Sequence, residues 1–142
     1  MESFMKYINR ISRCSDMYRG SKLRASGLNS CQHIYILKIC QNPGISQDEL
    51  ARLIYVNKSN VTRQLAALEE NGFIRREADS GDRRVQLVYP TQKADDICPR
   101  VRELMQAWNR RLTEDFSDEE RELLLAMLKR MMEKAEQEVA GL

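Results

Sequence analysis

The chain has 142 residues, of which 42% are hydrophobic, so its length and composition predict a single domain with one core. Its formal net charge is only +2, so the overall charge gives no argument for nucleic-acid binding. No apolar run reaches about eighteen residues and the N-terminus lacks the apolar core of a signal peptide, which predicts a cytoplasmic protein without a membrane partner. The four cysteines and the single histidine are dispersed, so we expect reduced thiols, no metal site and no cofactor.

Two helices are predicted before residue 45. The first covers residues 3–19, where an apolar stripe repeats at four- and three-residue spacings through Phe4, Ile8, Ile11, Ser15 and Tyr18. The segment from Gly20 to Gly27 should end it. Asn29 or Ser30 is then expected to cap a helix that stops at Asn42-Pro43-Gly44.

A tight pair of helices is predicted next. Ser46 and Glu49 have the spacing of a capping box, in which the hydroxyl and the carboxylate satisfy backbone N–H groups of the first helical turn. The residues from Ile54 to Asn57 favour a turn, and Asn57 or Ser59 can cap the following helix. That helix, about residues 58–71, should bury Val61, Leu65 and Leu68.

The outward face of this second helix is polar and lacks carboxylates. No acidic residue occurs between Asn57 and Leu68. Amide, hydroxyl and guanidinium groups can bond base edges and phosphates, so this face predicts a helix that enters the major groove of double-stranded DNA. The candidate DNA-binding residues here are Asn57, Lys58, Ser59, Asn60, Thr62, Arg63 and Gln64. The alternative is an ordinary solvated helix face.

A two-stranded hairpin, or wing, is predicted after the helix stop at Asn71-Gly72. Residues 73–77 and 85–89 have the β-branched and aromatic content of strands. The polar tip between them carries Asp82, Arg83 and Arg84, and such a tip can reach a minor groove or a row of phosphates. Alternatively, the arginines only pair with Asp79 and Asp82 on a surface hairpin.

Long apolar helices are predicted at the C-terminal end. Thr91 should open one of them, with Pro99 bending or delaying it, and Ser117 or Asp118 should cap the last. The terminal helices carry more apolar surface than a small winged core can cover, so we expect a twofold homodimer. The predicted organisation is a single, mostly α domain, with dimerisation helices at 1–27 and 92–142 around a winged helix-turn-helix core at 28–91. A monomer with folded-back helices is the alternative.

The sequence resembles the MarR family of bacterial transcriptional regulators. The resemblance is carried by Leu50-Ala51, by the stretch from Asn57 to Ile74, and by the wing pattern Asp79-x-x-Asp82-x-Arg84 leading through Val85 and Leu87 to Thr91. It implies that Arg84 enters the minor groove, that Asp82 braces it, and that Arg83 is a second contact. It also implies a homodimer on a palindromic operator, with repression the commoner outcome. Pro90 and Ala94 depart from the family pattern.

The resemblance implies an effector, a small aromatic or phenolic ligand that releases the DNA. Candidate pocket residues are Met17, Tyr18, His33, Tyr35 and Trp108, for each of which core or interface packing is the alternative. A thiol switch at Cys14 is a second possible input, because some family members sense oxidants through a cysteine in the first helix. Burial of Cys14 as a structural residue is the alternative that we favour.

An enzyme and a protein-interaction module are the two alternatives to a DNA-binding protein. The chain has no Gly-rich phosphate loop, no HExxH and no Gly-x-Ser-x-Gly motif, so we expect no catalytic residues. A winged helix used only for protein–protein contact is the more serious rival. The carboxylate-free face from Lys58 to Leu68 argues against it, because protein contact alone gives no reason to exclude acids there.

Overall fold

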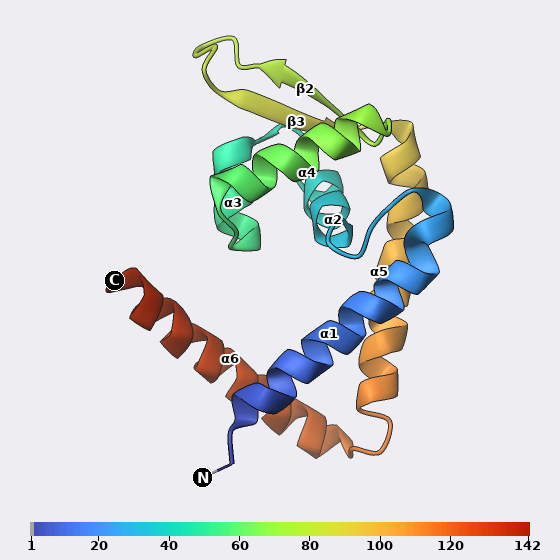
Figure 1. The fold of residues 1–142 in the computed structure, drawn as a ribbon, viewed down its shortest axis with the longest axis vertical. Helices are drawn as coiled ribbons and strands as arrows, with labels where there is room; N and C mark the ends of the chain where they lie inside the picture. Colours follow the sequence, from blue (N-terminus) through green and yellow to red (C-terminus); the bar gives the residue numbers. More distant parts are fainter. Residues whose placement is uncertain (1) are drawn as a thin grey trace. The chain divides into compact units, whose positions relative to one another are not determined.

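The computed structural model describes residues 2–142, which form six α-helices, a short 3-10 helix and three strands (Figure 1). In chain order these are α1 (Phe4–Leu23), η1 (Arg24–Ser26), α2 (His33–Gln41), β1 (Ile45–Ser46), α3 (Gln47–Ile54), α4 (Lys58–Glu70), β2 (Ile74–Ala78), β3 (Gln86–Pro90), α5 (Gln92–Leu112) and α6 (Asp118–Ala140). Two compact units are present, one ending at Met105 and one spanning Gln106–Leu142. Of the helices described, none is both long and apolar enough to cross a bilayer.

The first helix is longer than predicted. α1 continues through Gly20 and ends at Leu23, and the left-handed Gly27 (φ +84°) terminates the 3-10 turn that follows. Burial of Leu23 in the core stabilises the extra turn and outweighs the poor helix propensity of glycine. The helix thus ends within the predicted segment from Gly20 to Gly27, but at Leu23 and not at residue 19, because tertiary packing overrides the local preference of Gly20.

The predicted cap of α2 was also wrong. α2 begins at His33, and no side chain caps its first turn. Asn29 instead shapes the preceding turn, because its Oδ1 accepts from the Cys31 N–H at 3.0 Å while its own N–H donates to Gln32 Oε1 at 3.1 Å. Asparagine in a turn and asparagine at a helix N-cap satisfy neighbouring backbone groups in the same way, so the sequence does not separate them.

The predicted caps at Ser46 and Asn57 are confirmed, although at Ser46 only the hydroxyl half of the predicted capping box is found among the bonds of residues 2–142. Ser46 Oγ accepts from the Glu49 N–H at 3.2 Å, and Asn57 Oδ1 accepts from the Asn60 N–H at 2.7 Å. Between the two helices Tyr55 adopts a left-handed conformation (φ 66°), which turns the chain sharply. Both helix starts and the corner between them are therefore determined by local side-chain and backbone chemistry.

The core of the first unit lies beneath this helix pair. α3 contributes Leu50, and α4 contributes the predicted stripe Val61, Leu65 and Leu68, all of them fully buried. They pack with side chains of α2, β3 and the first half of α5, among them Ile36, Ile39, Val88, Ala94 and Val101. Burial of one side of α4 in this cluster decides which residues of α4 face outward.

The sheet has three antiparallel strands in the order β1-β3-β2, whereas only the two wing strands were predicted. β1 pairs Ile45 with Val88, and a Gly44 N–H bond to the Val88 carbonyl at 2.8 Å extends this pairing. A two-residue strand carries no alternation that a sequence pattern can reveal. β2 and β3 each begin one residue later than predicted, and the turn between them extends beyond the helices (Figure 1).

α5 starts where predicted, directly after Thr91. The Thr91 hydroxyl donates to the carbonyls of Gly72 (2.6 Å) and Phe73 (3.0 Å), and the Thr91 N–H also bonds the Phe73 carbonyl. These bonds tie the end of the wing to the segment that follows α4. Pro99 lies inside α5, so of the two effects expected of it, a bend or a delayed start, the delayed start does not occur.

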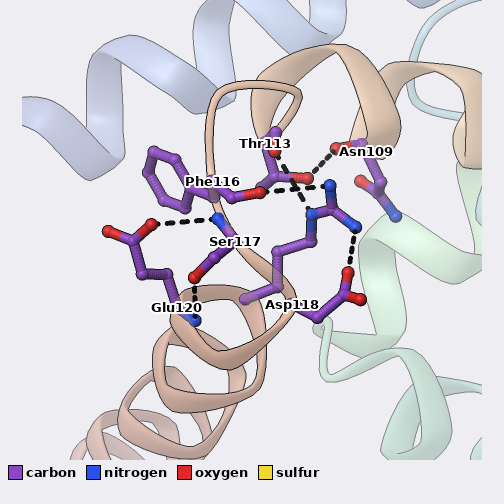
Figure 2. Close-up of polar contacts among 7 residues, drawn as sticks. Asn109, Thr113, Phe116, Ser117, Asp118 and Glu120 are labelled. Atoms are coloured by element: carbon purple, nitrogen blue, oxygen red, sulfur yellow. Dashed lines mark hydrogen bonds and ion pairs between the residues drawn. The ribbon is translucent and has the colours of Figure 1, made fainter.

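The second unit is organised by the corner between α5 and α6 (Figure 2). Ser117 and Glu120 form a complete capping box: Ser117 Oγ accepts from the Glu120 N–H at 3.1 Å, and the Glu120 carboxylate accepts from the Ser117 N–H at 2.9 Å. Arg121 bonds the Thr113 and Phe116 carbonyls and the Asp118 carboxylate. The corner is therefore held by several side-chain bonds to backbone groups.

Replacing Ser117 with alanine should lower the free energy of unfolding by about 1 kcal/mol, because the cap bond to Glu120 is lost. The measurement is urea denaturation at one fixed protein concentration. Ser3→Ala is the matched control, since Ser3 is the N-cap of α1 and makes no side-chain cap bond. Equal effects of the two substitutions would show that the capping box does not stabilise α6.

Candidate nucleic-acid interface

Seven candidate residues lie at the start of α4 or on its flanks, and the structure divides them into two groups. Five are exposed: Asn57, Lys58, Ser59, Thr62 and Arg63. Asn60 and Gln64 are half-buried and lie one turn apart, beside the buried stripe. The exposed face of α4 is therefore narrower than the sequence predicted.

Exposed side chains on this face mostly bond their own helix. Ser59 Oγ donates to Asn57 Oδ1 at 2.8 Å, and Thr62 Oγ1 donates to the Lys58 carbonyl at 3.0 Å. Lys58 pairs with Asp48 of α3 at 3.4 Å, but both side chains are well exposed, so the pair contributes little free energy. These groups can exchange their present partners for a ligand at small cost.

The half-buried Asn60 differs from its neighbours because it bonds another element. The Tyr35 hydroxyl on α2 donates to Asn60 Oδ1. Tyr35 is only 2% exposed, and this burial raises the pKa of its hydroxyl. Tyr35, predicted to line an effector pocket, is thus a core residue that contacts α4.

The wing tip carries one paired arginine and one unpaired arginine. Arg84 donates to both oxygens of Asp82, from Nε at 3.1 Å and from Nη2 at 3.2 Å, and its guanidinium holds the pKa of the Asp82 carboxyl below the usual value. The Arg84 side chain is nevertheless 90% exposed. Arg83 is exposed and takes part in none of the ion pairs found within residues 2–142.

A cluster at the base of the wing was not predicted. Arg76 on β2 donates to Glu69 of α4 at 2.9 Å and to Gln47 of α3 at 3.2 Å, while its backbone N–H bonds the same carboxylate at 3.2 Å. The Arg76 bonds hold the pKa of Glu69 low. The adjacent acids and adjacent arginines were visible in the sequence, but no spacing rule shows which acid meets which arginine. The cluster fixes the wing to both helices.

The residues proposed for an effector pocket are not brought together by the contacts of the first unit. Met17 is 74% exposed, whereas Tyr35 is buried. His33 is half-buried, and its Nδ1 lies 3.0 Å from the Ser30 carbonyl, to which Arg19 also donates at 3.2 Å. Burial and the Arg19 charge hold the pKa of His33 down. Trp108 belongs to the other unit.

An open hollow lies instead at the helix-turn-helix corner, and none of the five effector candidates lines it. Its walls are Asp48, Ala51, Arg52, Tyr55, Val56, Asn57 and Lys58. The charged side chains and the exposed Tyr55 ring make it a surface feature of the first unit.

The cysteines correct one expectation. Cys14 is exposed, not buried as predicted, because the stripe it accompanies on α1 faces outward in this chain. Cys98 is buried and accepts from Arg102 at 3.2 Å, and burial beside Cys98 raises the pKa of Cys40 to about 12. In the part of the chain that is described, no three His, Cys, Asp or Glu side chains are grouped to hold a metal ion.

Comparisons with known proteins agree with this geometry. The model of the MarR family matches residues 28–85. The chain is 28% identical to the uncharacterised HTH-type transcriptional regulator YybA of Bacillus subtilis, over 97% of this chain and 92% of that protein. It is 32% identical to a solved structure of MarR (TM-score 0.86; 99% and 96% of the two chains).

A third comparison concerns a DNA complex. A putative MarR family transcriptional regulator from Listeria monocytogenes, solved with a 26mer DNA, is 25% identical to this chain and has a TM-score of 0.88. The match covers 94% of this chain and 89% of that one. On the shared winged fold and the identity to MarR over nearly the whole length, the chain belongs to the MarR family of transcriptional regulators.

Proposed function

We propose that this protein is a repressor that binds a palindromic DNA operator as a homodimer and is released by a small-molecule effector. The observation that carries the proposal is the exposed, carboxylate-free start of α4 together with a wing tip that has two exposed arginines. The Listeria regulator solved with DNA has the same fold and supports it. Such a regulator acts in the cytoplasm and needs no catalytic residues.

The groups on the two elements suit different parts of a DNA duplex. Hydroxyl, amide and guanidinium groups of Ser59, Thr62 and Arg63 can bond base edges in the major groove. Arg84 and Arg83 at the wing tip suit phosphates or a narrow minor groove, where positive charge is favoured. Asp82 orients Arg84 without covering it, since most of the Arg84 side chain remains in solvent.

Exposed apolar side chains on the terminal helices support a homodimer. Five of them lie on α1, namely Phe4, Met5, Tyr7, Ile11 and Met17. α6 contains no buried residue and exposes Leu123, Leu125, Met127, Leu128, Met131, Met132 and Val139. Apolar surface of this extent is unfavourable in water, and a second copy of the chain would remove it from solvent.

The proposed effector contact lies near Arg19 on α1. An aromatic or phenolic anion would find positive charge at Arg19, whose guanidinium also pairs with Asp16 at 2.5 Å. Tyr18 and His33, both half-buried, are the two original candidates that we retain for such a contact. Tyr35 is less suited because its hydroxyl is engaged with Asn60.

Selection from a random double-stranded DNA library should recover an imperfect palindrome with half-sites about 10 base pairs apart, because a twofold axis relates two α4 helices in successive major grooves. Affinity for the selected DNA should fall steeply with added salt, since phosphate contacts release counterions. Failure to enrich any sequence, together with a flat salt response, would refute DNA binding.

Arg84→Ala should weaken binding to the selected operator about tenfold, because a charge-assisted contact is lost, while the base preferences of α4 stay unchanged. Fluorescence anisotropy on a panel of operator variants measures both effects. Arg130→Ala is the control, since Arg130 is an exposed residue of α6 and its removal changes the net charge equally. Loss of base discrimination with affinity spared would contradict the assignment of Arg84.

Sedimentation equilibrium should give twice the 16.6 kDa chain mass. Leu128→Glu should weaken the dimer at least about tenfold, because it places an unpaired carboxylate in the apolar surface of α6. Gln137→Glu adds the same charge at an exposed polar position of α6 and should leave the mass unchanged. A monomeric wild-type protein, or equal effects of both substitutions, would count against dimerisation through α6.

A further inference from the structure

The Tyr35–Asn60 bond links the core to the DNA-binding helix at a position where the sequence predicted a free amide. Tyr35 lies on α2 and Asn60 in the first turn of α4. Because Tyr35 is 2% exposed and packed in the core, its hydroxyl is fixed in place. The Asn60 backbone N–H is also occupied, by the Asn57 cap at 2.7 Å. Both main-chain and side-chain bonds therefore hold Asn60 in one orientation.

This bond turns the Asn60 amide oxygen toward the buried Tyr35 hydroxyl, so the amide nitrogen is the outward group. The amide oxygen accepts the Tyr35 hydroxyl, and the amide nitrogen carries two N–H groups. Among residues 2–142 no acceptor is found for that nitrogen, and no fully buried side-chain nitrogen or oxygen there lacks a partner. The nitrogen of Asn60 therefore reaches solvent, beside the exposed face of α4.

Arg63 adds further hydrogen-bond donors beside Asn60 on α4. It lies one turn after Asn60 on α4, and its charge acts on the Tyr35 hydroxyl. Arg63 is exposed and has only a long bond of 3.4 Å to the Ser59 carbonyl. The Asn60 amide nitrogen and the Arg63 guanidinium thus both offer N–H groups and no acceptor.

Base recognition depends on which groups of the amide are free. Asparagine selects adenine by two bonds, in which its oxygen accepts from adenine N6 and its nitrogen donates to N7. Guanine presents N7 and O6, both acceptors, so a group that only donates bonds guanine as well as adenine. We infer that Tyr35, by holding the amide oxygen toward the core, makes Asn60 bond a purine through its amide nitrogen alone, a contact that does not distinguish adenine from guanine. The inference rests on the proposed DNA-binding function.

The test begins by locating the base pair that Asn60 contacts. The probe is the double-stranded DNA that wild-type protein selects from a random library, with every position of the half-site then substituted. Asn60→Ala should relax the preference at one symmetry-related position. Wild-type protein should bind the adenine and guanine versions of that position with affinities within about threefold of each other.

Tyr35→Phe is the decisive variant because it removes only the hydroxyl. The freed amide oxygen can then accept from adenine N6, so the ratio of adenine to guanine affinity should rise at least about fivefold at that position alone. In an Asn60→Ala background the same substitution should leave the ratio unchanged. A role for Tyr35 in stability alone would weaken binding to all sequences equally.

A second measurement uses wild-type protein and does not depend on the folding of Tyr35→Phe. At the contacted purine, replacing N7 with carbon should weaken binding, because the donor loses its acceptor. Removing the 6-amino group of adenine should have no effect, because the amide oxygen faces the Tyr35 hydroxyl and not the base. Equal losses from the two changes would overturn the inference.

The remaining outcomes separate this inference from the proposed function. If DNA is selected but Asn60→Ala relaxes no position, Asn60 contacts no base and the inference is wrong while DNA binding stands. If folded Tyr35→Phe leaves the ratio unchanged, the inference is likewise wrong. If wild-type protein selects no DNA sequence at all, both the proposed function and the inference fall.

Discussion

Burial of one side of α4 is the constraint on which the rest of the structure depends. Val61, Leu65 and Leu68 fill the core of the first unit, so the helix cannot rotate about its axis without exposing them. Full burial of such side chains contributes about 1.5–3 kcal/mol each, more than any exposed polar bond on this surface. The apolar stripe therefore determines which polar residues face outward, and the polar residues determine what that surface can bind.

Polar contacts fix the positions of the wing and of individual side chains, which apolar packing does not determine. Arg76 joins the wing to α3 and α4, and the Thr91 hydroxyl ties the end of the wing to the carbonyls after α4. The wing tip is held differently, because Arg84 is oriented by Asp82 while staying in solvent. The Tyr35 hydroxyl likewise orients a side chain of α4, since it bonds the Asn60 amide oxygen and leaves the amide nitrogen free. The wing and α4 are thus held rigidly, whereas Arg84 and the amide nitrogen of Asn60 remain free to bond a ligand.

The sequence predicted those features that depend on neighbouring residues. The caps at Ser46, Asn57 and Ser117 and the stop at Gly72 follow from bonds over a few residues, and each is confirmed. Features that depend on distant residues were missed: the strand β1, the Arg76 cluster and the Tyr35–Asn60 bond join segments far apart in the chain. Local propensity placed the end of α1 a few residues too early, because burial of Leu23 prolongs the helix past Gly20. The exposure of Cys14 was not predicted, because an apolar stripe on a helix does not show whether the surface that packs against it belongs to the same chain or to another chain.

Methylation-protection footprinting on a selected DNA is the most direct test of the central claim, that the exposed start of α4 and the arginine tip of the wing together bind DNA. The account predicts protection of guanine N7 in two major-groove patches about 10 base pairs apart, with protection of adenine N3 in the minor groove beside them. Protection confined to the minor groove, or no protection at concentrations that saturate binding, would contradict it.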